Sequence, residues 1–139
     1  MTEDHQLAIR NLVHRYADAV CKRDDAQWAS CWAPDGQWNV LSRSLQGLDD
    51  VMAFYRRAMA RYDAVVQLVH NGVADIANDS GLGCWYITEH AWRGESGSLL
   101  IARYDDAYIR VDGSWLFSRR ALTVHYSGPA DLSGAPVPP

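Results

Sequence analysis

The sequence predicts a single α+β domain in which helices cover one face of a curved antiparallel sheet. Apolar residues recur at helical spacing in the first part of the chain, and alternation with a period of two dominates from residue 65 onward. Turn-forming residues separate the alternating runs. Helices followed by strands are typical of this fold class. A chain of 139 residues is long enough for one such domain with a core and a modest pocket.

Two helices are expected at the start of the chain. In segment 3–23, apolar side chains fall on one stripe of a helix, which therefore packs inward. A short helix over 26–32 follows, and Asp24 or Asp25 can serve as its N-cap. The sequence Pro34-Asp35-Gly36 is expected to end this helix as a turn.

One short strand and a third helix come next. Segment 37–41 is interpreted as a strand and segment 42–47 as a polar loop. Segment 48–61 carries apolar residues at helical spacing, with its arginines on the outer face. It is therefore predicted to be a helix.

Four longer strands make up the rest of the domain. Asp112-Gly113 is the strongest hairpin signal and predicts that the last strand pairs back on the one before it. Residues 1–127 are expected to form the domain, and 128–139, rich in Pro, Gly and Ser, an irregular tail. The predicted strands are 65–77, 82–93, 98–111 and 115–126.

The first of these strands predicts an inward-facing histidine. Side chains alternate between the two faces of a strand, so Val66, Leu68 and His70 share one apolar face. A sheet that hides a histidine is typical of a cavity wall. Two interpretations stay open: a core histidine whose ring nitrogens find hydrogen-bond partners, or a general base or acid whose pKa lies near neutrality.

Charge and hydropathy argue against several partners. The net charge is −4 and the arginines are scattered among acids, which disfavours nucleic acid. No apolar run reaches the roughly 20 residues that a membrane helix needs. The acidic start is unlike a signal peptide. We therefore expect a cytoplasmic protein without membrane contact.

The cysteines and the glycines argue against cofactors. Cys21, Cys31 and Cys84 lack CxxC spacing, which disfavours a disulfide framework or a structural zinc site. No HExxH-like cluster is present, and no glycine-rich loop leads from a strand into a helix. The expectation is that the protein uses neither a metal nor a nucleotide cofactor.

Four sequence features carry a resemblance to a known family. They are Arg15-Tyr-Ala-Asp-Ala-Val, Asp24 before Trp28, Ala33-Pro-Asp-Gly-Gln-Trp, and the run that begins Tyr104-Asp-Asp-Ala-Tyr and ends at Arg119. Together they resemble the SnoaL-like branch of the nuclear transport factor 2-like superfamily, over about residues 5–127. The resemblance implies a cone-shaped α+β barrel. Within the branch the chain is most similar to scytalone dehydratase-like members, whose chemistry is metal-free and cofactor-free elimination of water from a cyclic hydroxyketone.

The resemblance also implies the catalytic residues. His70 matches the histidine that pairs with an aspartate to abstract a proton, and His90 lies close to the position of a second histidine that assists. Tyr104 falls where the family places a polar pocket residue.

The chain departs from the family pattern at the dyad. Val20-Cys21 stands where those dehydratases carry a Tyr-Asp pair, and Val40 replaces a tyrosine. Loss of a carboxylate that orients an imidazole can cost on the order of 10⁴ in rate, as in the serine-protease triad. Asp106 could orient a histidine instead, or pair with Arg119 or Arg120. The predicted substrate-binding residues are Tyr16, Val20, Cys21, Val40, Tyr86 and Asp106.

We therefore expect a lyase (dehydratase) or isomerase that acts on a small hydrophobic cyclic hydroxyketone or enone. His70 would take a proton alpha to a carbonyl, and Tyr104 or His90 would polarise the oxygen. The alternative is a non-catalytic protein of the same fold that binds small hydrophobic ligands. The resemblance also leaves open a partner subunit of an oxygenase. A homo-oligomer formed through the sheet is expected.

Overall fold

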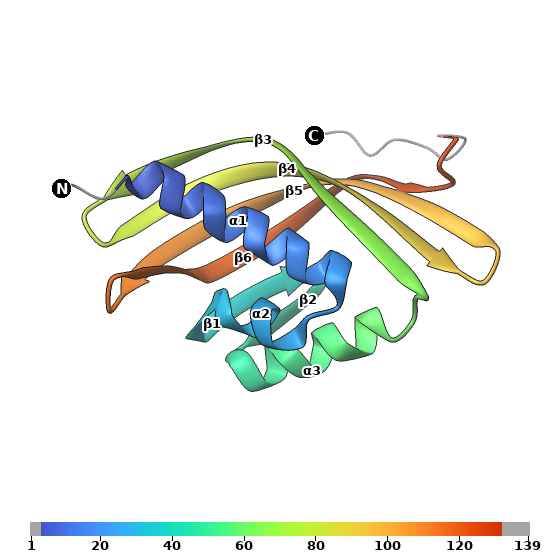
Figure 1. Ribbon diagram of the computed structural model, residues 1–139, viewed down its shortest axis with the longest axis horizontal. Helices are drawn as coiled ribbons and strands as arrows, with labels where there is room; N and C mark the ends of the chain where they lie inside the picture. The colour runs from blue at the N-terminus through green and yellow to red at the C-terminus, as the bar shows by residue number, and fades with distance from the viewer. Residues whose placement is uncertain (1–3, 132–139) are drawn as a thin grey trace.

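The computed structural model describes residues 4–131, which form three helices and one six-stranded sheet. The sheet curves around the helices, and α1 crosses it on the side that α2 and α3 also occupy (Figure 1). The predicted α+β class with helices over one face of a curved sheet is therefore confirmed. The elements are α1 His5–Lys22, α2 Asp25–Ser30, β1 Trp32–Val40, β2 Arg43–Gln46, α3 Leu48–Met59, β3 Ala64–Ala77, β4 Ser80–Arg93, β5 Ser96–Val111 and β6 Ser114–Gly128.

The sheet is mixed rather than purely antiparallel. Its strand order is β2-β1-β6-β5-β4-β3. β1 runs parallel to β6, whereas every other neighbouring pair is antiparallel. The first strand in the chain thus pairs with the last, which the order of elements along the sequence did not indicate.

The largest error in element assignment concerns residues 32–47. Segment 42–47, predicted to be a polar loop, contains β2, which pairs with β1 after a turn at Leu41-Ser42. Both turn residues adopt positive φ, at 50° and 61°, although neither is a glycine or an asparagine, so the sequence carries no hairpin signal there. The sequence Pro34-Asp35-Gly36 lies within β1, where the pairing register with β6 shifts, and does not end a helix as a turn.

The sequence predicted correctly the features in which a single side chain or a short turn determines the backbone conformation. Asp24 is the N-cap of α2 and accepts a hydrogen bond from the backbone N–H of Gln27. Asp112 and Gly113 have φ of 50° and 81° and join β5 to β6, as predicted. Of the predicted tail, Gly128 belongs to β6, and residues 132–139 lie outside the described part.

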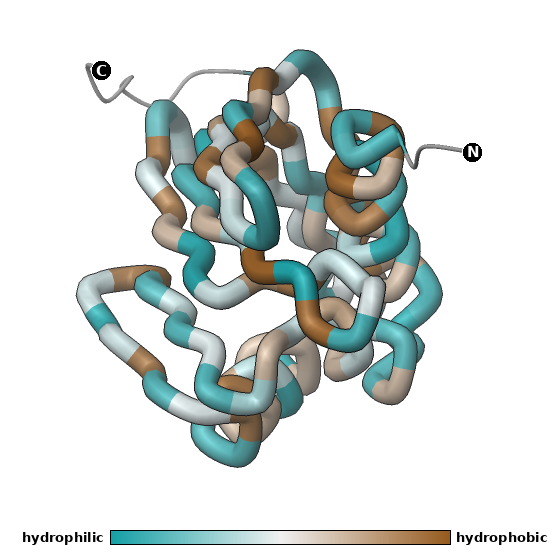
Figure 2. The backbone as a smooth tube through the Cα atoms, turned by 90° about the vertical axis from the view of Figure 1, so that its left-hand side faces the viewer, coloured by the Kyte–Doolittle hydropathy of each residue, from teal (hydrophilic) through white to brown (hydrophobic). Residues whose placement is uncertain are grey.

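Helix α1 packs through one stripe of buried residues. Ile9, Val13, Tyr16 and Val20 are all at most 4% exposed. Hydrophobic and hydrophilic residues alternate around its coil in Figure 2. None of the helices within residues 4–131 is long and apolar enough to cross a membrane.

The first half of strand β3 presents the opposite face from the one predicted. Val65 and Gln67 are buried toward the helices, whereas Val66, Leu68 and His70 lie on the outer face and are exposed. The prediction that His70 faces inward is therefore wrong. The pairing register of β3 with β4 shifts between Val69 and Gly72, and beyond this irregularity Ala74 and Ile76 pack against the core, as predicted. A strict alternation along the sequence does not reveal such a shift.

A buried ion pair lies at the centre of the core. The guanidinium of Arg120 (β6) donates from Nε to Oδ1 of Asp106 (β5) at 2.7 Å and from Nη2 to Oδ2 at 3.0 Å. Both side chains are at most 1% exposed. The Tyr108 hydroxyl donates to Asp106 Oδ2 at 2.9 Å, and Trp85 Nε1 donates to that hydroxyl at 2.9 Å. Asp106 thus pairs with Arg120, one of the two arginines considered from the sequence.

Aromatic rings surround the cation of this pair. The Arg120 guanidinium carbon lies 3.9 Å from the ring centroid of Tyr104, 4.1 Å from that of Phe117 and 4.4 Å from that of Tyr16. Cation–π attraction is strongest when the cation is desolvated, as it is here. The pair therefore connects the two central strands to α1 through ring faces.

We predict that Arg120→Met lowers the free energy of unfolding by about 3–5 kcal/mol, because it leaves the Asp106 carboxylate buried without its cation. Urea unfolding measures the change. The control is Arg56→Met, which removes an exposed pair with Asp25 and should cost less than about 1 kcal/mol. Equal losses in the two variants would contradict this account.

Candidate functional site

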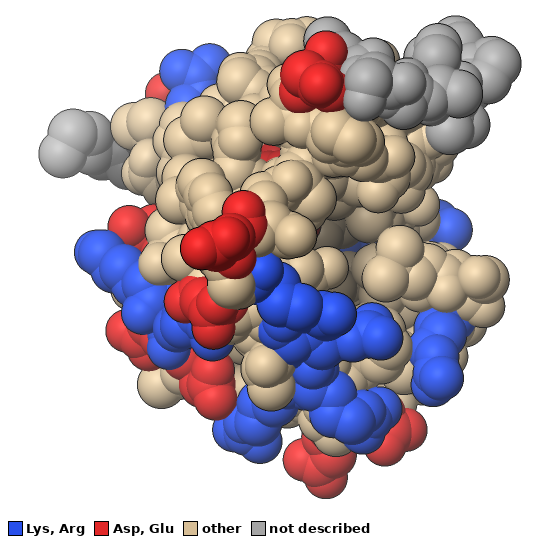
Figure 3. All heavy atoms as spheres, turned by 90° about the vertical axis from the view of Figure 1, so that its right-hand side faces the viewer, with Lys and Arg blue, Asp and Glu red and all other residues tan. Residues whose placement is uncertain are grey.

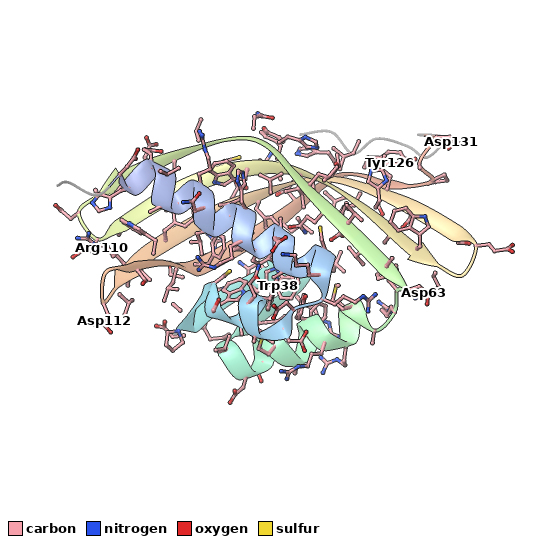
Figure 4. All side chains as sticks on the ribbon, viewed as in Figure 1. Trp38, Asp63, Arg110, Asp112, Tyr126 and Asp131 are labelled. Carbon is pink, nitrogen blue, oxygen red and sulfur yellow. The ribbon has the colours of Figure 1, made fainter. Side chains whose placement is uncertain are left out.

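A cavity of about 100 Å³ lies between the helices and the sheet. Trp38, part of its wall, lies in the interior between them (Figure 4). Most of the wall is aromatic and aliphatic, with contributions from all three helices and from β1, β3, β4 and β5. Such a wall with a few convergent polar groups is typical of a small-molecule site. The polar groups on it include Tyr16, Tyr55, Gln67, Glu89 and Tyr104.

Four of the residues proposed from the sequence line this cavity. They are Tyr16 and Val20 on α1, Val40 at the end of β1, and Tyr104 on β5. The structure therefore brings together one proposed catalytic residue and three proposed substrate-binding residues.

The two proposed catalytic histidines lie elsewhere, on the outer face of the sheet. His70 is exposed, and its Nε2 lies 2.9 Å from Oγ1 of Thr88. His90 stacks on Trp92 with ring centroids 6.2 Å apart. Tyr86, proposed to bind substrate, is 39% exposed and stacks on His125 on the same face. None of the three proposed residues lines the cavity.

Cys21 and Asp106 are also engaged outside the cavity. The Cys21 thiol donates to the backbone carbonyl oxygen of Gln67 at 3.4 Å and accepts from the backbone N–H of Gln67 at 3.2 Å. These two hydrogen bonds connect α1 to β3. Asp106 is occupied by Arg120 and Tyr108. The residue of β3 that faces Cys21 is thus Gln67 rather than His70.

Glu89 is the ionisable residue in the cavity that sequence reasoning missed. On β4, Trp85, Ile87, Glu89 and Ala91 alternate toward the helices, and Gln67 Nε2 donates to Glu89 Oε1 at 3.2 Å. Burial raises the pKa of Glu89, and the hydrogen bond from Gln67 only partly offsets it. The available signal was an acid that shares one strand face with three apolar residues.

Two tyrosine hydroxyls meet beside this carboxylate. The hydroxyl oxygens of Tyr16 and Tyr104 lie 3.2 Å apart, so one donates to the other. Burial raises the pKa of both tyrosines, and both therefore stay protonated near neutral pH. Since the pair holds two hydroxyl protons and its mutual hydrogen bond uses one, the second proton is available to an oxygen in the cavity.

Several buried polar atoms of the wall have no hydrogen-bond partner among the described residues. They include the Tyr55 hydroxyl, Gln67 Oε1 and Trp28 Nε1. Burial raises the pKa of Tyr55 to about 12, so its hydroxyl is a donor. Because buried polar groups are nearly always hydrogen-bonded, a cluster of unpartnered ones favours an occupant that carries both donors and acceptors. Within residues 4–131, no three His, Cys, Asp or Glu side chains converge as metal ligands.

Comparisons with known proteins agree with this architecture. A hexachlorocyclohexane dehydrochlorinase of Sphingobium indicum, the gamma-hexachlorocyclohexane enzyme, is 26% identical over 131 residues, covering 88% of this chain and 81% of the relative. The crystal structure of LinA superposes with a TM-score of 0.82 at 24% identity, covering 96% of this chain and 92% of LinA.

A second solved structure is equally close in shape. A Novosphingobium aromaticivorans protein assigned provisionally to the scytalone dehydratases superposes with a TM-score of 0.82 at 16% identity, covering 93% of this chain and 89% of that one. The SnoaL-like domain family matches residues 3–121, almost the whole of the curved sheet and its helices. The chain therefore belongs to the SnoaL-like domain family, as the sequence motifs indicated.

Proposed function

We propose that this protein is a cofactor-free lyase that acts on a small hydrophobic cyclic substrate, with Glu89 as the base. The observation that carries the proposal is a partly buried carboxylate in an aromatic cavity, beside a tyrosine pair with a hydroxyl proton to donate. The similar dehydrochlorinase of Sphingobium indicum supports this proposal, since its name describes an elimination of hydrogen chloride. An isomerase would use the same first step and return the proton to a different carbon.

Glu89 replaces His70 in this proposal for a geometric reason. The family pattern pairs a histidine of the first long strand with an acid at the end of the first helix. Here the residues that meet at that place are Gln67 and Cys21. An amide is not a base at neutral pH, and the thiol is engaged with backbone. The nearest proton acceptor in the cavity is Glu89, hydrogen-bonded to that same Gln67.

The proposed reaction starts with transfer of a substrate α-proton to a Glu89 oxygen. The electron pair of that C–H bond moves onto the adjacent carbonyl, whose oxygen gains negative charge and accepts a hydrogen bond from the Tyr16–Tyr104 pair. When the electrons return, the bond to a β-hydroxyl breaks. That hydroxyl leaves as water with the proton that Glu89 holds. A carboxylate with a raised pKa is a stronger base for the first step.

A non-catalytic ligand-binding protein is the second candidate. It is favoured by the contact of Cys21, which stands where the family carries its aspartate, with the backbone of Gln67 and not with a histidine. The unpartnered Tyr55 hydroxyl and Gln67 Oε1 would then serve only to bind. The two candidates differ in whether a ligand is chemically changed.

We predict that Glu89→Gln lowers turnover of cyclic hydroxyketones by at least about 10³-fold, because the amide cannot accept the proton. Ultraviolet absorbance of the enone product measures the rate. His70→Ala is the matched comparison and should retain near-complete activity, since His70 is exposed on the other face of the sheet. An inactive His70→Ala beside an active Glu89→Gln would refute the assignment. Ligand binding without turnover in the unaltered protein would favour the second candidate.

The same Glu89→Gln variant should be more stable than the unaltered protein at neutral pH. The folded-state pKa of Glu89 is raised by burial, so the folded protein holds this proton more tightly than the unfolded chain. The buried charge of Glu89 lowers the free energy of unfolding. This loss is absent below the unfolded-state pKa of about 4.3, where the carboxyl is protonated in both states, and it is complete once the pH has risen through the folded-state pKa. Thermal unfolding should show a higher Tm for the variant at neutral pH, with the difference vanishing near pH 4. A lower Tm at neutral pH would contradict it.

Removal of one cavity hydroxyl should slow the chemical step more than it weakens binding. We predict that Tyr104→Phe lowers kcat by about 10²-fold with a small change in KM, because the hydrogen bond to the substrate oxygen strengthens as charge develops. Steady-state kinetics measure both constants. Tyr86→Phe removes a hydroxyl from the outer face and should leave kcat unchanged. A rise in KM alone for Tyr104→Phe would assign that hydroxyl to binding only.

A further inference from the structure

A second hollow adjoins the cavity. This outer hollow has a volume of about 270 Å³ and lies over β2 and the C-terminal part of α3. Leu41, Phe54 and Ala58 line both spaces and therefore lie at the boundary between them. The remaining residues that line the outer hollow are Arg43, Arg57 and Arg61.

The outer hollow is strongly basic in an otherwise acidic protein. The chain has a net charge of −4, yet three arginines converge here. Lys and Arg side chains gather on the face of the molecule that carries the end of α3 (Figure 3). Within residues 4–131, no carboxylate forms an ion pair with Arg43, Arg57 or Arg61. Their charges are therefore available to a ligand.

Two of these cations flank the ring of Phe54 at this boundary. The guanidinium carbons of Arg43 and Arg57 lie 5.6 Å and 5.9 Å from the ring centroid of Phe54. Phe54 also lines the inner cavity. A ligand ring that enters beside Phe54 would therefore carry any outward substituent into the reach of both guanidinium groups.

Helix electrostatics do not account for this convergence. Cations near the C-terminus of a helix stabilise the helix, and this effect by itself would explain why an arginine occupies position 57, near the end of α3. It does not explain Arg43, which comes from β2 and points to the same hollow. The neighbouring Arg56 illustrates the difference, since it pairs with Asp25 at 3.1 Å and does not line the hollow.

We propose that the outer hollow binds an oxyanion substituent of the ligand, so that the substrate class is a single-ring carboxylate. This inference rests on the proposed function only in taking the inner cavity as the place of the ring. Guanidinium groups are well suited to carboxylates, which they bind through paired N–H donors. The inner cavity of about 100 Å³ and the adjoining outer hollow of about 270 Å³ together exceed the roughly 150 Å³ of a cavity that holds benzene, so one ring with its substituent fits across the two.

The two charged regions would orient the ligand. Glu89 lies in the inner cavity and the three arginines line the outer hollow. A carboxylate is repelled by the first and attracted by the second, so the ring enters with its carboxylate outward. The reacting carbon then faces Glu89 and the tyrosine pair.

The test compares 4-hydroxybenzoate with 4-hydroxybenzamide, which differ in charge but hardly in shape. Quenching of tryptophan fluorescence gives Kd for each compound. We expect the carboxylate to bind about 10-fold more tightly than the amide. Raising salt from about 20 to about 300 mM should reduce this preference. Arg57→Gln/Arg61→Gln should abolish it without weakening amide binding, whereas Arg56→Gln should retain it.

Glu89→Gln offers an independent readout of orientation. It should tighten binding of 4-hydroxybenzoate more than binding of 4-hydroxybenzamide, since only the carboxylate is repelled by the charge that the substitution removes. Equal affinity of the two compounds for the unaltered protein would overturn the oxyanion site while leaving the inner cavity and the role of Glu89 intact. A preference that survives in Arg57→Gln/Arg61→Gln would also overturn it. Binding of neither compound would overturn the ring site as well.

Discussion

The buried pair of Arg120 and Asp106 is the interaction on which the rest of the structure depends. Two unit charges away from water are stable only when their hydrogen bonds are satisfied, and here Tyr108 and Trp85 complete the set on the carboxylate side. On the cation side, the rings of Tyr16, Tyr104 and Phe117 replace water. This arrangement requires β5, β6 and α1 to lie in one relative position.

The same interaction prepares the wall of the cavity. The tyrosines whose rings cover Arg120 are those whose hydroxyls meet 3.2 Å apart in the site. Their orientation is therefore determined by the core and does not need a ligand. Donors that are held in place before a substrate arrives cost little reorganisation during a reaction. The positive charge behind the rings further favours negative charge on an oxygen bound in front of them.

The family relationship is one of shape more than of individual groups. The SnoaL-like cone is kept, with TM-scores of 0.82 to structures only 16% and 24% identical. The end of α1 meets β3 where Cys21 contacts the backbone of Gln67, whereas His70, the residue matched to the family's histidine, lies on the outer face of the sheet. Our proposal moves the base to the next strand, where Glu89 accepts a hydrogen bond from the same glutamine. One fold can host different chemistries because function depends on which side chains line its cavity.

The sequence by itself determined the fold class, most helix and strand segments, a cap for α2 at Asp24 or Asp25 and the Asp112-Gly113 turn, because short-range geometry governs these features. It also indicated Tyr16, Val20, Val40 and Tyr104, which line the cavity. Only the tertiary structure decided the face that His70, Glu89 and Tyr86 occupy, the β2 hairpin, and the convergence of Arg43 with Arg57 and Arg61. A period of two shows that neighbours lie on opposite faces, but the packing of helices decides which face is inside.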